Sequence, residues 1–507
     1  MIHHDLTLIA GAPSPQPHDV LHLNHLIDGV WRASASGQTF ERTSPASGDL
    51  VSVAALGGTA DVERAIEAAR NAFDDGRWSD IPGSQRAKLL NKVADLIEAN
   101  RERFALYETL ESGKPISQAR AEIEGAADIW RYAGTLAWNI RGQSQNALGP
   151  DMLGVVLKEP IGVVSIIAPW NFPFLIVSQK LPFALAAGCT AVVKPSEMTS
   201  ATTVILGELL IEAGVPNGVV NIVLGFGDPV GAAMTTHSSV DMVTFTGSTH
   251  VGKAIVAATS GTLKKVSLEL GGKNPQVIFP DADLDQAADA IVFGVYFNAG
   301  ECCNSGSRII VHEDVVDALN EKVVALSRKV PFGDPLNPET KVGAIISSDH
   351  HAKIDGYVKG AQKSGADVIL GGDTVTIDGL SGQFYQPTVV AGVTADMAIA
   401  KEEVFGPVLA VLTFATFDEA ISLVNDAAYG LSAGVWSENV HTCVKFARKA
   451  QAGTVWTNTW MDGFPELPFG GVKESGIGRE LGSNAVEEFL ETKTVQMRIG
   501  KTREPWV

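Results

Sequence analysis

The alternation of apolar and polar residues along the chain changes its period near Pro160. Residues 61–140 carry apolar side chains at helical spacing, which predicts long amphipathic helices. After Pro160, short apolar runs alternate with segments of helical length. The runs that predict buried strands are 162–168, 190–193, 219–223, 241–245 and 266–270. Strands that alternate with helices predict a parallel sheet with both faces covered.

A second alternating block begins at residues 276–279 and predicts another α/β unit. Its expected helices are 283–298, 314–328 and one that begins at Asp418, and its later strands are 408–414 and 431–436. Two further segments, the polar 139–157 and the tail 491–507, are candidates for edge strands that reach another subunit.

A chain of 507 residues is too long for one ordinary core, because a domain usually holds about 100–200 residues. We therefore expect two large domains and a small additional element. The hydrophobic share of 45% argues against disorder.

The net charge of −19 disfavours nucleic acid and anionic membranes as partners, because both require clustered Lys and Arg. No apolar run reaches the roughly 18 residues that span a bilayer. The start at Met1 also lacks a basic segment followed by a hydrophobic one. These features predict a protein of the cytoplasm with no membrane partner.

The four cysteines give neither a disulfide framework nor zinc-ligand spacing, because the only close pair, Cys302 and Cys303, is adjacent. His18, His22 and His25 stand at helical spacing and could bind a metal, but no Cys or acidic ligand set accompanies them. We predict no metal site and a reducing compartment.

Two segments, 300–308 and 268–273, supply a candidate thiol and a candidate carboxylate. Cys303 could attack a carbonyl carbon as a thiolate, and Glu269 could deprotonate the water that hydrolyses the resulting thioester. A cysteine alone is more often a small buried hydrophobe, and a glutamate alone a solvated side chain. No histidine stands near Cys303 in the sequence, so nearby donors or a bound cofactor should favour its thiolate.

Two glycine-rich loops, 225–231 and 245–252, compete for a phosphate. In the first loop Asp228 stands at the expected start of a helix, where its carboxylate would cap the helix and repel a pyrophosphate. The second loop has no acidic residue and offers backbone N–H groups and hydroxyls at a helix N-terminus, so we favour it. Either loop could instead be an ordinary strand-to-helix turn.

Lys194 and Glu197 follow the expected strand 190–193 and could hydrogen-bond two ribose hydroxyls. The Glu197 carboxylate would repel a 2′-phosphate, which predicts NAD rather than NADP as the cofactor. The alternative is a surface ion pair without a ligand.

The chain resembles the aldehyde dehydrogenase superfamily from about Leu26 to Met497. Seven motifs in family order carry this resemblance: 169–173, 194–197, 245–249, 268–273, 300–303, 403–407 and 468–471. Any one of them might arise by chance, whereas the set essentially cannot.

The resemblance implies an α/β fold with a Rossmann-like parallel-sheet cofactor domain, a second α/β catalytic domain and a small β oligomerisation element. The implied bounds are 1–141 and 161–272 for the NAD-binding domain, 273–473 for the catalytic domain, and 142–160 with 487–507 for the bridging element. Such an element implies a homodimer, or a homotetramer built from two dimers.

The resemblance also implies the catalytic roles. Cys303, rather than Cys302, is the nucleophile, Asn171 donates its side-chain amide to the oxyanion, and Glu269 is the general base. Lys180 and Glu480 match residues proposed for proton relay. The residues implied at NAD are Pro169, Trp170, Asn171, Lys194, Ser196, Glu197, Gly227, Gly231, Phe245, Gly247, Ser248, Val251, Leu270, Glu403 and Phe405.

The substrate side is expected to include Phe172, Cys302, Asn304, Trp460 and Phe469. Trp460 lies in a loop similar to that of betaine-aldehyde and aminoaldehyde dehydrogenases, where its ring could hold an ammonium group. The alternative is an aromatic wall for apolar aldehydes that includes Phe174 and Trp456. Glu301 replaces the Gln of many relatives, and we expect its carboxylate to point away from the nucleophile.

The expected function is NAD-dependent oxidation of an aldehyde to a carboxylic acid through a Cys303 thioester. A cysteine hydrolase or acyltransferase would leave the nucleotide contacts without a purpose. A non-catalytic protein of the same fold would have no need to keep all three of Cys303, Glu269 and Asn171. A relative that transfers the acyl group to coenzyme A should lack the base Glu269.

Overall fold

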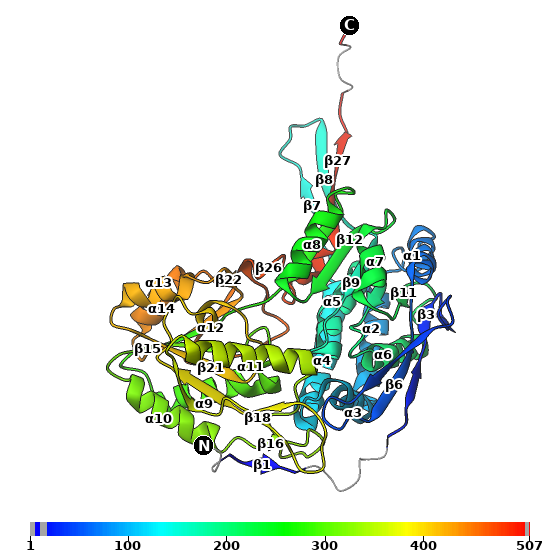
Figure 1. The fold of residues 1–507 in the computed structure, drawn as a ribbon. Coiled ribbons are helices and arrows are strands. Elements are labelled where there is room, and N and C mark those ends of the chain that lie inside the picture. Colours follow the sequence, from blue (N-terminus) through cyan, green and yellow to red (C-terminus); the bar gives the residue numbers. More distant parts are fainter. Residues whose placement is uncertain (1–5, 11–17, 502–505) are drawn as a thin grey trace.

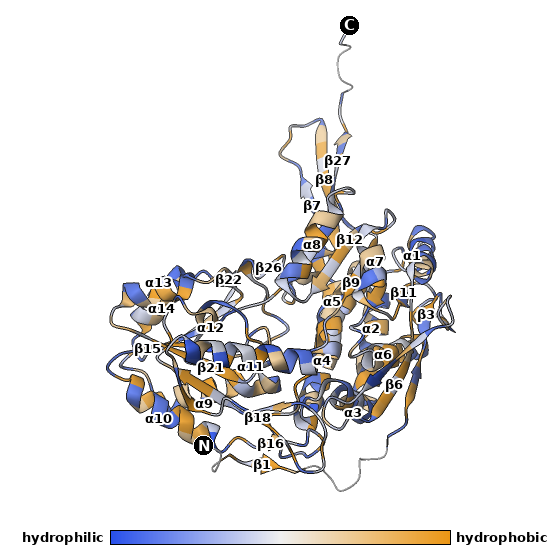
Figure 2. Ribbon diagram, in the orientation of Figure 1, coloured by the Kyte–Doolittle hydropathy of each residue, from blue (hydrophilic) through white to orange (hydrophobic). Residues whose placement is uncertain are grey.

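Two α/β units with mostly parallel sheets form the body of the molecule, and a narrow third sheet projects from it (Figure 1). The computed structural model describes residues 6–10, 18–501 and 506–507. Met1–Asp5, considered above for a signal peptide, lie outside the described residues. Figure 2 shows that apolar residues occupy much of both central sheets, as expected for strands covered on two faces.

The first unit is built on an eight-stranded sheet whose five central strands are parallel. In sheet order the strands are β26 (Gly476–Ile477), β13 (Lys265–Glu269), β12 (Met242–Thr246), β9 (Val163–Ile167), β10 (Thr190–Lys194), β11 (Val220–Ile222), β3 (His25–Ile27) and β4 (Val30–Arg32). The five predicted strands are confirmed, each end within one residue.

Helices cover both faces of this sheet. Val164 and Ile166 of β9 belong to one buried cluster, whereas Val163 and Ile167 belong to another on the opposite face. The helices of this unit are α1 (Thr59–Asp74), α2 (Gly83–Ala99), α3 (Arg101–Ser112), α4 (Ile116–Ala137), α5 (Pro173–Ala187), α6 (Ala201–Ala213), α7 (Ala232–Thr236) and α8 (Thr249–Thr259). The alternating burial along β9 is the physical reason for two helical layers.

The second unit has a seven-stranded sheet that is parallel except for β17 at one edge. In sheet order the strands are β17 (Asp367–Leu370), β20 (Thr388–Ala391), β21 (Val408–Phe414), β15 (Arg308–His312), β14 (Pro275–Ile278), β23 (Ser432–Trp436) and β24 (Thr454–Thr457). Its helices are α9 (Leu284–Tyr296), α10 (Val316–Ser327), α11 (Ser348–Lys363), α12 (Ala398–Lys401), α13 (Phe417–Asn425) and α14 (Val440–Lys449). The predicted second α/β unit is confirmed.

The projecting sheet joins β7 (Gln143–Gln145), β8 (Met152–Pro160) and β27 (Leu490–Arg498) in antiparallel pairs (Figure 1). β27 pairs with β8 along its whole length, from Leu490 opposite Pro160 to Arg498 opposite Met152. Parts of both expected edge segments, 139–157 and 491–507, are therefore strands, and they pair with each other within one chain. Residues 502–505 of the tail lie outside the described residues.

Shorter elements complete the described chain: β1 (Leu8–Ile9), β2 (Leu21–Leu23), β5 (Thr39–Thr43), β6 (Leu50–Ala55), η1 (Gly227–Gly231), η2 (Phe297–Gly300), β16 (Phe332–Gly333), β18 (Thr374–Val375), β19 (Phe384–Tyr385), β22 (Tyr429–Gly430), β25 (Val472–Lys473) and α15 (Ala485–Glu488). β1 pairs with β16, and Leu6 packs on the core of the second unit. The sequence-based bounds placed all of 1–141 in the first unit, whereas the contacts of residues 6–9 are with the second.

The early histidines do not share a helix, as their spacing suggested, because His22 and His25 lie in the strands β2 and β3. The buried His25 accepts a hydrogen bond from the Leu224 N–H at Nδ1. Within residues 6–10, 18–501 and 506–507, no group of three or more His, Cys, Asp or Glu side chains is arranged for a metal ion. No helix in these same ranges is long and apolar enough to cross a bilayer.

Candidate active site

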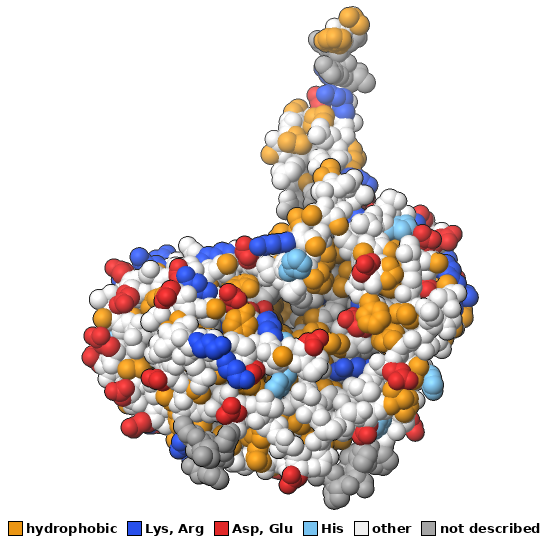
Figure 3. Space-filling model, in the orientation of Figure 1, with side chains coloured by type: hydrophobic (Ala, Val, Ile, Leu, Met, Phe, Trp, Pro, Cys, Tyr) orange, Lys and Arg blue, Asp and Glu red, His pale blue; other side chains and the backbone are white. Residues whose placement is uncertain are grey.

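A cleft lies at the carboxyl ends of β9, β12 and β13, where ligands of open parallel sheets bind. Figure 3 shows the surface hollowed between α8 and α11, which face each other across the two units. The cleft is lined by Pro169, Trp170, Asn171, Thr246, Gly247, Ser248, Leu270, Gly271, Cys303, His350, Lys353, Glu403 and Phe405. Nine of these thirteen residues were candidate site residues from the sequence.

A tight turn before the nucleophile candidate presents Cys303 to this cleft. Asn298 and Ala299 adopt left-handed backbone angles with φ of 51° and 55°. The Asn298 side-chain amide stabilises the turn by donating to the carbonyls of Asn171 and Glu301, at 3.0 and 2.9 Å. Gly300 also has positive φ, and a Cβ there would collide with the Gly406 carbonyl. Only glycine fits this position.

The thiol of Cys303 is partly exposed, whereas the Cys302 side chain is buried in the core of the first unit. A hydrogen bond with the Cys302 thiol, together with burial, raises the pKa of Cys303 well above its ordinary value. We expected nearby donors or a bound cofactor to favour the thiolate. The protein side chains alone do the opposite, because a neighbouring thiol cannot stabilise a negative sulfur as a cation would. Because Cys302 is a buried core residue, little of its side chain is available for the predicted substrate contact.

Asn171 follows β9 and lies beside the Cys303 turn. Its Nδ2 donates to the Glu301 carbonyl at 3.1 Å. A primary amide carries two hydrogens on this nitrogen, so one hydrogen remains for another acceptor. The Glu301 carboxylate is directed at Ile346, whose N–H it accepts at 3.0 Å, and burial raises its pKa.

Glu269 is the last residue of β13 and only 4% of it is exposed. Neither carboxyl oxygen has a hydrogen-bond partner among the described residues. Burial and the nearby Glu480 raise the pKa of Glu269 well above its ordinary value, and Lys180 partly offsets this. The Lys180 ammonium forms a buried ion pair with Glu480 and donates to Thr244 Oγ1 at 3.2 Å. Of the five candidate catalytic residues, Asn171 and Cys303 line the cleft, and Lys180 and Glu480 lie close to Glu269.

Several candidate NAD-binding residues do not line the cleft and lie in the loops that follow β10 and β11. Lys194 Nζ lies 3.6 Å from Glu197 Oε2, and burial lowers the pKa of Lys194. A Cβ on Gly231 would lie 3.8 Å from Lys194 Cδ, so the two loops are adjacent. Gly227 begins η1 with open space around it, and Ser196 is buried nearby on the Lys194 loop.

The predicted helix cap at Asp228 is wrong. Asp228 has extended backbone angles within η1, and no side-chain hydrogen bond caps that turn. In the favoured loop, Ser248 caps α8 by accepting the Val251 N–H at 3.3 Å, so its hydroxyl oxygen is engaged. Phe245 is buried behind this loop and Val251 is exposed beside it.

The donors and acceptors around the cleft fit NAD. Thr246 Oγ1 is buried and has no partner among the described residues, so a polar ligand could satisfy it. Glu403 accepts the Gly272 N–H at 2.9 Å, and burial raises its pKa to about 7. The carboxylates of Glu197 and Glu403 suit the two riboses as hydroxyl acceptors.

Four lining residues were not candidates: Thr246 and Gly271 lie inside motifs named above, whereas His350 and Lys353 lie outside all of them. The latter two lie in the first two turns of α11 in the second unit, far in sequence from the strands that end at the cleft. Burial lowers the pKa of His350 to about 4, so its ring is neutral at neutral pH. The one feature of the local sequence that could have indicated this part of the site is the pair of histidines after Ser348 and Asp349, at the start of α11.

Aromatic rings line the substrate side of the nucleophile. Phe172 stacks on Phe297 with ring centroids 6.0 Å apart, and Phe297 lies 5.3 Å from Phe293, which is 47% exposed. Phe469 is half-buried against the core of the first unit, and Asn304 accepts the Ser432 hydroxyl at 3.2 Å. Phe293 extends this aromatic cluster to the surface.

The placement of Trp460 on the substrate side is wrong, and so is that of Phe174. Trp460 is 3% exposed and packs on Gly294, Gly306 and Gly434, and a Cβ at Gly294 or Gly434 would collide with its ring. Phe174 is completely buried in the core. Neither ring can be reached by an ammonium group, because the protein already occupies the space over it.

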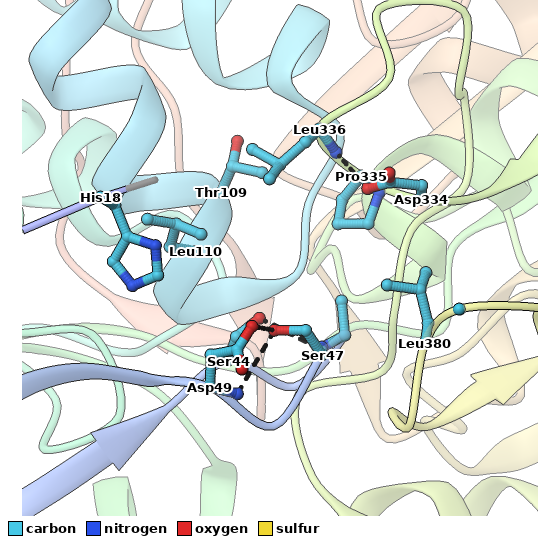
Figure 4. A pocket seen from close by; sticks show the side chains of 12 residues that line it. His18, Ser44, Ser47, Asp49, Thr109, Leu110, Asp334, Pro335, Leu336 and Leu380 are labelled. Carbon is cyan, nitrogen blue, oxygen red and sulfur yellow. Dashed lines mark hydrogen bonds between the residues drawn. The ribbon is translucent and has the colours of Figure 1, made fainter. Parts of the chain in front are cut away.

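A second cavity lies between the 44–49 turn, the end of α3 and the 334–336 loop (Figure 4). Some of its polar groups are paired locally: Ser47 Oγ donates to Asp49 Oδ2 at 2.7 Å, and Leu336 N–H donates to Asp334 Oδ1 at 2.9 Å. The buried Thr109 Oγ1 has no partner among the described residues. It contains none of the candidate site residues.

Comparison with known proteins gives consistent matches over the whole length. The model of the aldehyde dehydrogenase family matches residues 31–495. An NAD-dependent aldehyde dehydrogenase from Sinorhizobium meliloti is 50% identical with a TM-score of 0.96, over 98% of this chain and 99% of that one. A betaine aldehyde dehydrogenase from Staphylococcus aureus in complex with NAD+ is 39% identical with a TM-score of 0.93, over 96% of both chains. A mitochondrial benzaldehyde dehydrogenase from Antirrhinum majus is 41% identical, over 95% of this chain and 90% of that one.

Proposed function

This chain belongs to the aldehyde dehydrogenase family and is an NAD-dependent aldehyde dehydrogenase, and on that premise we propose that it releases a free carboxylic acid through a thioester on Cys303. One observation carries the proposal: a buried carboxyl group without a partner among the described residues, Glu269, lies near the nucleophile candidate. Hydrolysis needs a base close to the acyl group, whereas transfer to another thiol does not.

In the proposed reaction the Cys303 thiol releases its proton to water, its sulfur bonds to the aldehyde carbon, and the carbonyl oxygen becomes an oxyanion. The second hydrogen of Asn171 Nδ2 and the Cys303 backbone N–H donate to that oxygen. NAD, when bound, supplies the hydride acceptor for the oxidation. Lys194, Glu197, Ser248, Glu403 and the other cleft residues hold the cofactor.

Glu269 then takes a proton from the water that attacks the thioester. The proton passes toward the Lys180–Glu480 ion pair behind it. The proximity of the pair supports this route, since Glu480 and Lys180 both influence the pKa of Glu269.

Replacing Asn171 by alanine is expected to lower kcat about 100- to 1,000-fold, as loss of one oxyanion donor does in other acyl-transfer enzymes. The KM for the aldehyde should change little, because the donor acts mainly on the charged intermediate. Steady-state kinetics with wild type and Asn171→Ala measure both quantities. A decrease in kcat of less than about three-fold would contradict the oxyanion role.

We propose apolar aldehydes as the substrates, and betaine aldehyde or aminoaldehydes as the alternative. The rings of Phe172, Phe297 and Phe293 support the first choice. The alternative draws support from the S. aureus relative, but that relative and the benzaldehyde dehydrogenase are almost equally similar to this chain.

The substrate class is tested by kcat/KM for phenylacetaldehyde, a medium-chain aliphatic aldehyde, aminobutyraldehyde and betaine aldehyde. We expect the two apolar aldehydes to exceed the two cationic ones by about ten-fold or more, because an uncompensated ammonium loses hydration in apolar surroundings. A higher value for betaine aldehyde or aminobutyraldehyde would favour the alternative.

We also assign NAD binding to 18–141 and 161–272, catalysis to 273–473, and assembly to the projecting sheet of 142–160 and 487–501, because residues 6–9 contact the second unit. Trp138, Leu148 and Ile499, at or beside this sheet, are more than half exposed, which supports a homodimer or a tetramer of two dimers. Four free cysteines support the reducing environment of the cytoplasm.

A further inference from the structure

The first turn of α11 contacts the loop that follows α12, across the edge of the cleft. His350 Nε2 lies 2.6 Å from the Phe405 carbonyl oxygen. A carbonyl only accepts, so this nitrogen must carry the hydrogen. The backbone N–H of His350 donates to the Ser347 hydroxyl, which caps α11 and fixes the main chain that carries the ring.

We propose that His350 is a positioning residue that fixes the 403–406 loop and thereby the nicotinamide-ribose end of the cofactor site. This role rests on the proposed assignment of Glu403 and Phe405 to NAD. His350 acts through the loop backbone, and the role requires no direct contact with the reacting atoms.

The loop requires such support because its backbone is strained. Phe405 has a φ of 61°, a left-handed conformation that is unfavourable for a residue with a bulky side chain. The hydrogen bond from His350 holds the carbonyl of that same residue. A strained residue persists only when its surroundings determine it, and the contact of His350 with the Phe405 carbonyl is one such constraint.

Ring contacts reinforce this hydrogen bond. The centroids of Trp170 and Phe405 each lie within 6 Å of the His350 ring, at 5.5 and 5.9 Å, and Trp170 meets Phe405 edge-on at 5.5 Å. Three mutually perpendicular or tilted rings therefore join the strand-end loop of the first unit to α11 and the 403–406 loop of the second.

Both ends of the loop make contacts that matter for the site. Upstream, Glu403 accepts the Gly272 N–H, three residues after the candidate base. Downstream, Gly406 packs against Ile354 of α11 and against Gly300 in the turn before Cys303. A loop released from His350 would therefore shift Glu403 relative to the nucleophile turn.

The neighbouring His351 provides a matched control. It lies on the same helix, it is 9% exposed, and its Nε2 lies 3.2 Å from the Phe384 carbonyl, away from the cleft. Its removal costs a comparable buried hydrogen bond without touching the 403–406 loop.

The test measures the Kd for NAD by titration calorimetry without aldehyde, together with the thermal unfolding midpoint, for wild type, His350→Leu, His350→Gln and His351→Leu. We expect His350→Leu to weaken NAD binding about ten-fold, as loss of one buried hydrogen bond predicts. His350→Gln should restore Kd to within about three-fold, because its amide can donate to the same carbonyl. His351→Leu should lower the unfolding midpoint and leave Kd unchanged.

An unchanged Kd in His350→Leu, or an equal weakening in His351→Leu, overturns the role. If His350→Leu does not fold, His350→Asn, whose amide is too short to reach Phe405, replaces it with the same expected loss. Failure here leaves the proposed function standing, because wild-type NAD binding and NADH formation test that function separately.

Discussion

Replacing Cys303 by alanine should abolish NADH formation while NAD binding survives. Without the sulfur no covalent adduct forms, and loss of a nucleophile costs about 10⁴-fold or more in other covalent enzymes. NAD should still bind, because its proposed contacts come mainly from β10, β12, α11 and the 403–406 loop. Absorbance of NADH at saturating aldehyde measures the first quantity, and titration calorimetry measures the second.

Cys443→Ala is the matched control for this loss. Cys443 is buried on α14, and its thiol donates to the Ser437 carbonyl, away from the cleft. It should keep wild-type kcat within about two-fold, as expected of a site distant from the chemistry. Retention of NADH formation in Cys303→Ala would sink the covalent mechanism.

Glu269→Gln should give a rapid burst of NADH followed by slow turnover. The thioester can form without the carboxylate, but its hydrolysis loses the general base, which typically contributes about 10²- to 10⁴-fold. Stopped-flow absorbance resolves the burst, whose amplitude should approach one NADH per active site. An unchanged steady-state rate, or no burst, would contradict the assignment.

The same carboxyl predicts the pH dependence of the wild-type enzyme. Burial and Glu480 raise the pKa of Glu269, so the protonated form persists at pH values where an exposed glutamate is ionised. Only the ionised form can accept a proton from water. Steady-state turnover should therefore rise with pH through the raised pKa, and this rise should disappear in Glu269→Gln, which does not titrate.

The sheets could be predicted from the sequence because their strands are buried on both faces. Val163–Ile167 is buried at every position, and a run of that kind is visible without any partner. The ends of the five central strands were therefore expected within one residue. Strands β2 and β3 were not predicted, because the spacing of the three histidines gives no information about the residues between them.

The candidate site was only partly visible in the sequence. Cys303, Asn171 and Glu269 stand in motifs, so the resemblance located them, and the cleft or its border includes all three. His350 reaches the cleft from another unit, and no spacing rule connects it to β9. Trp460 was misplaced because its burial depends on three glycines from α9, the nucleophile loop and β23.

The short strand β26, near the carboxyl-terminal end of the chain, lies at one edge of the first sheet. Gly476 and Ile477 pair with Glu269 and Leu268 of β13 and cover an edge that would otherwise expose unpaired N–H and C=O groups. A chain truncated after the second unit would therefore carry a bare sheet edge beside Glu269, and edges of that kind recruit other chains. Solubility of the amino-terminal half thus depends on residues more than 200 positions away.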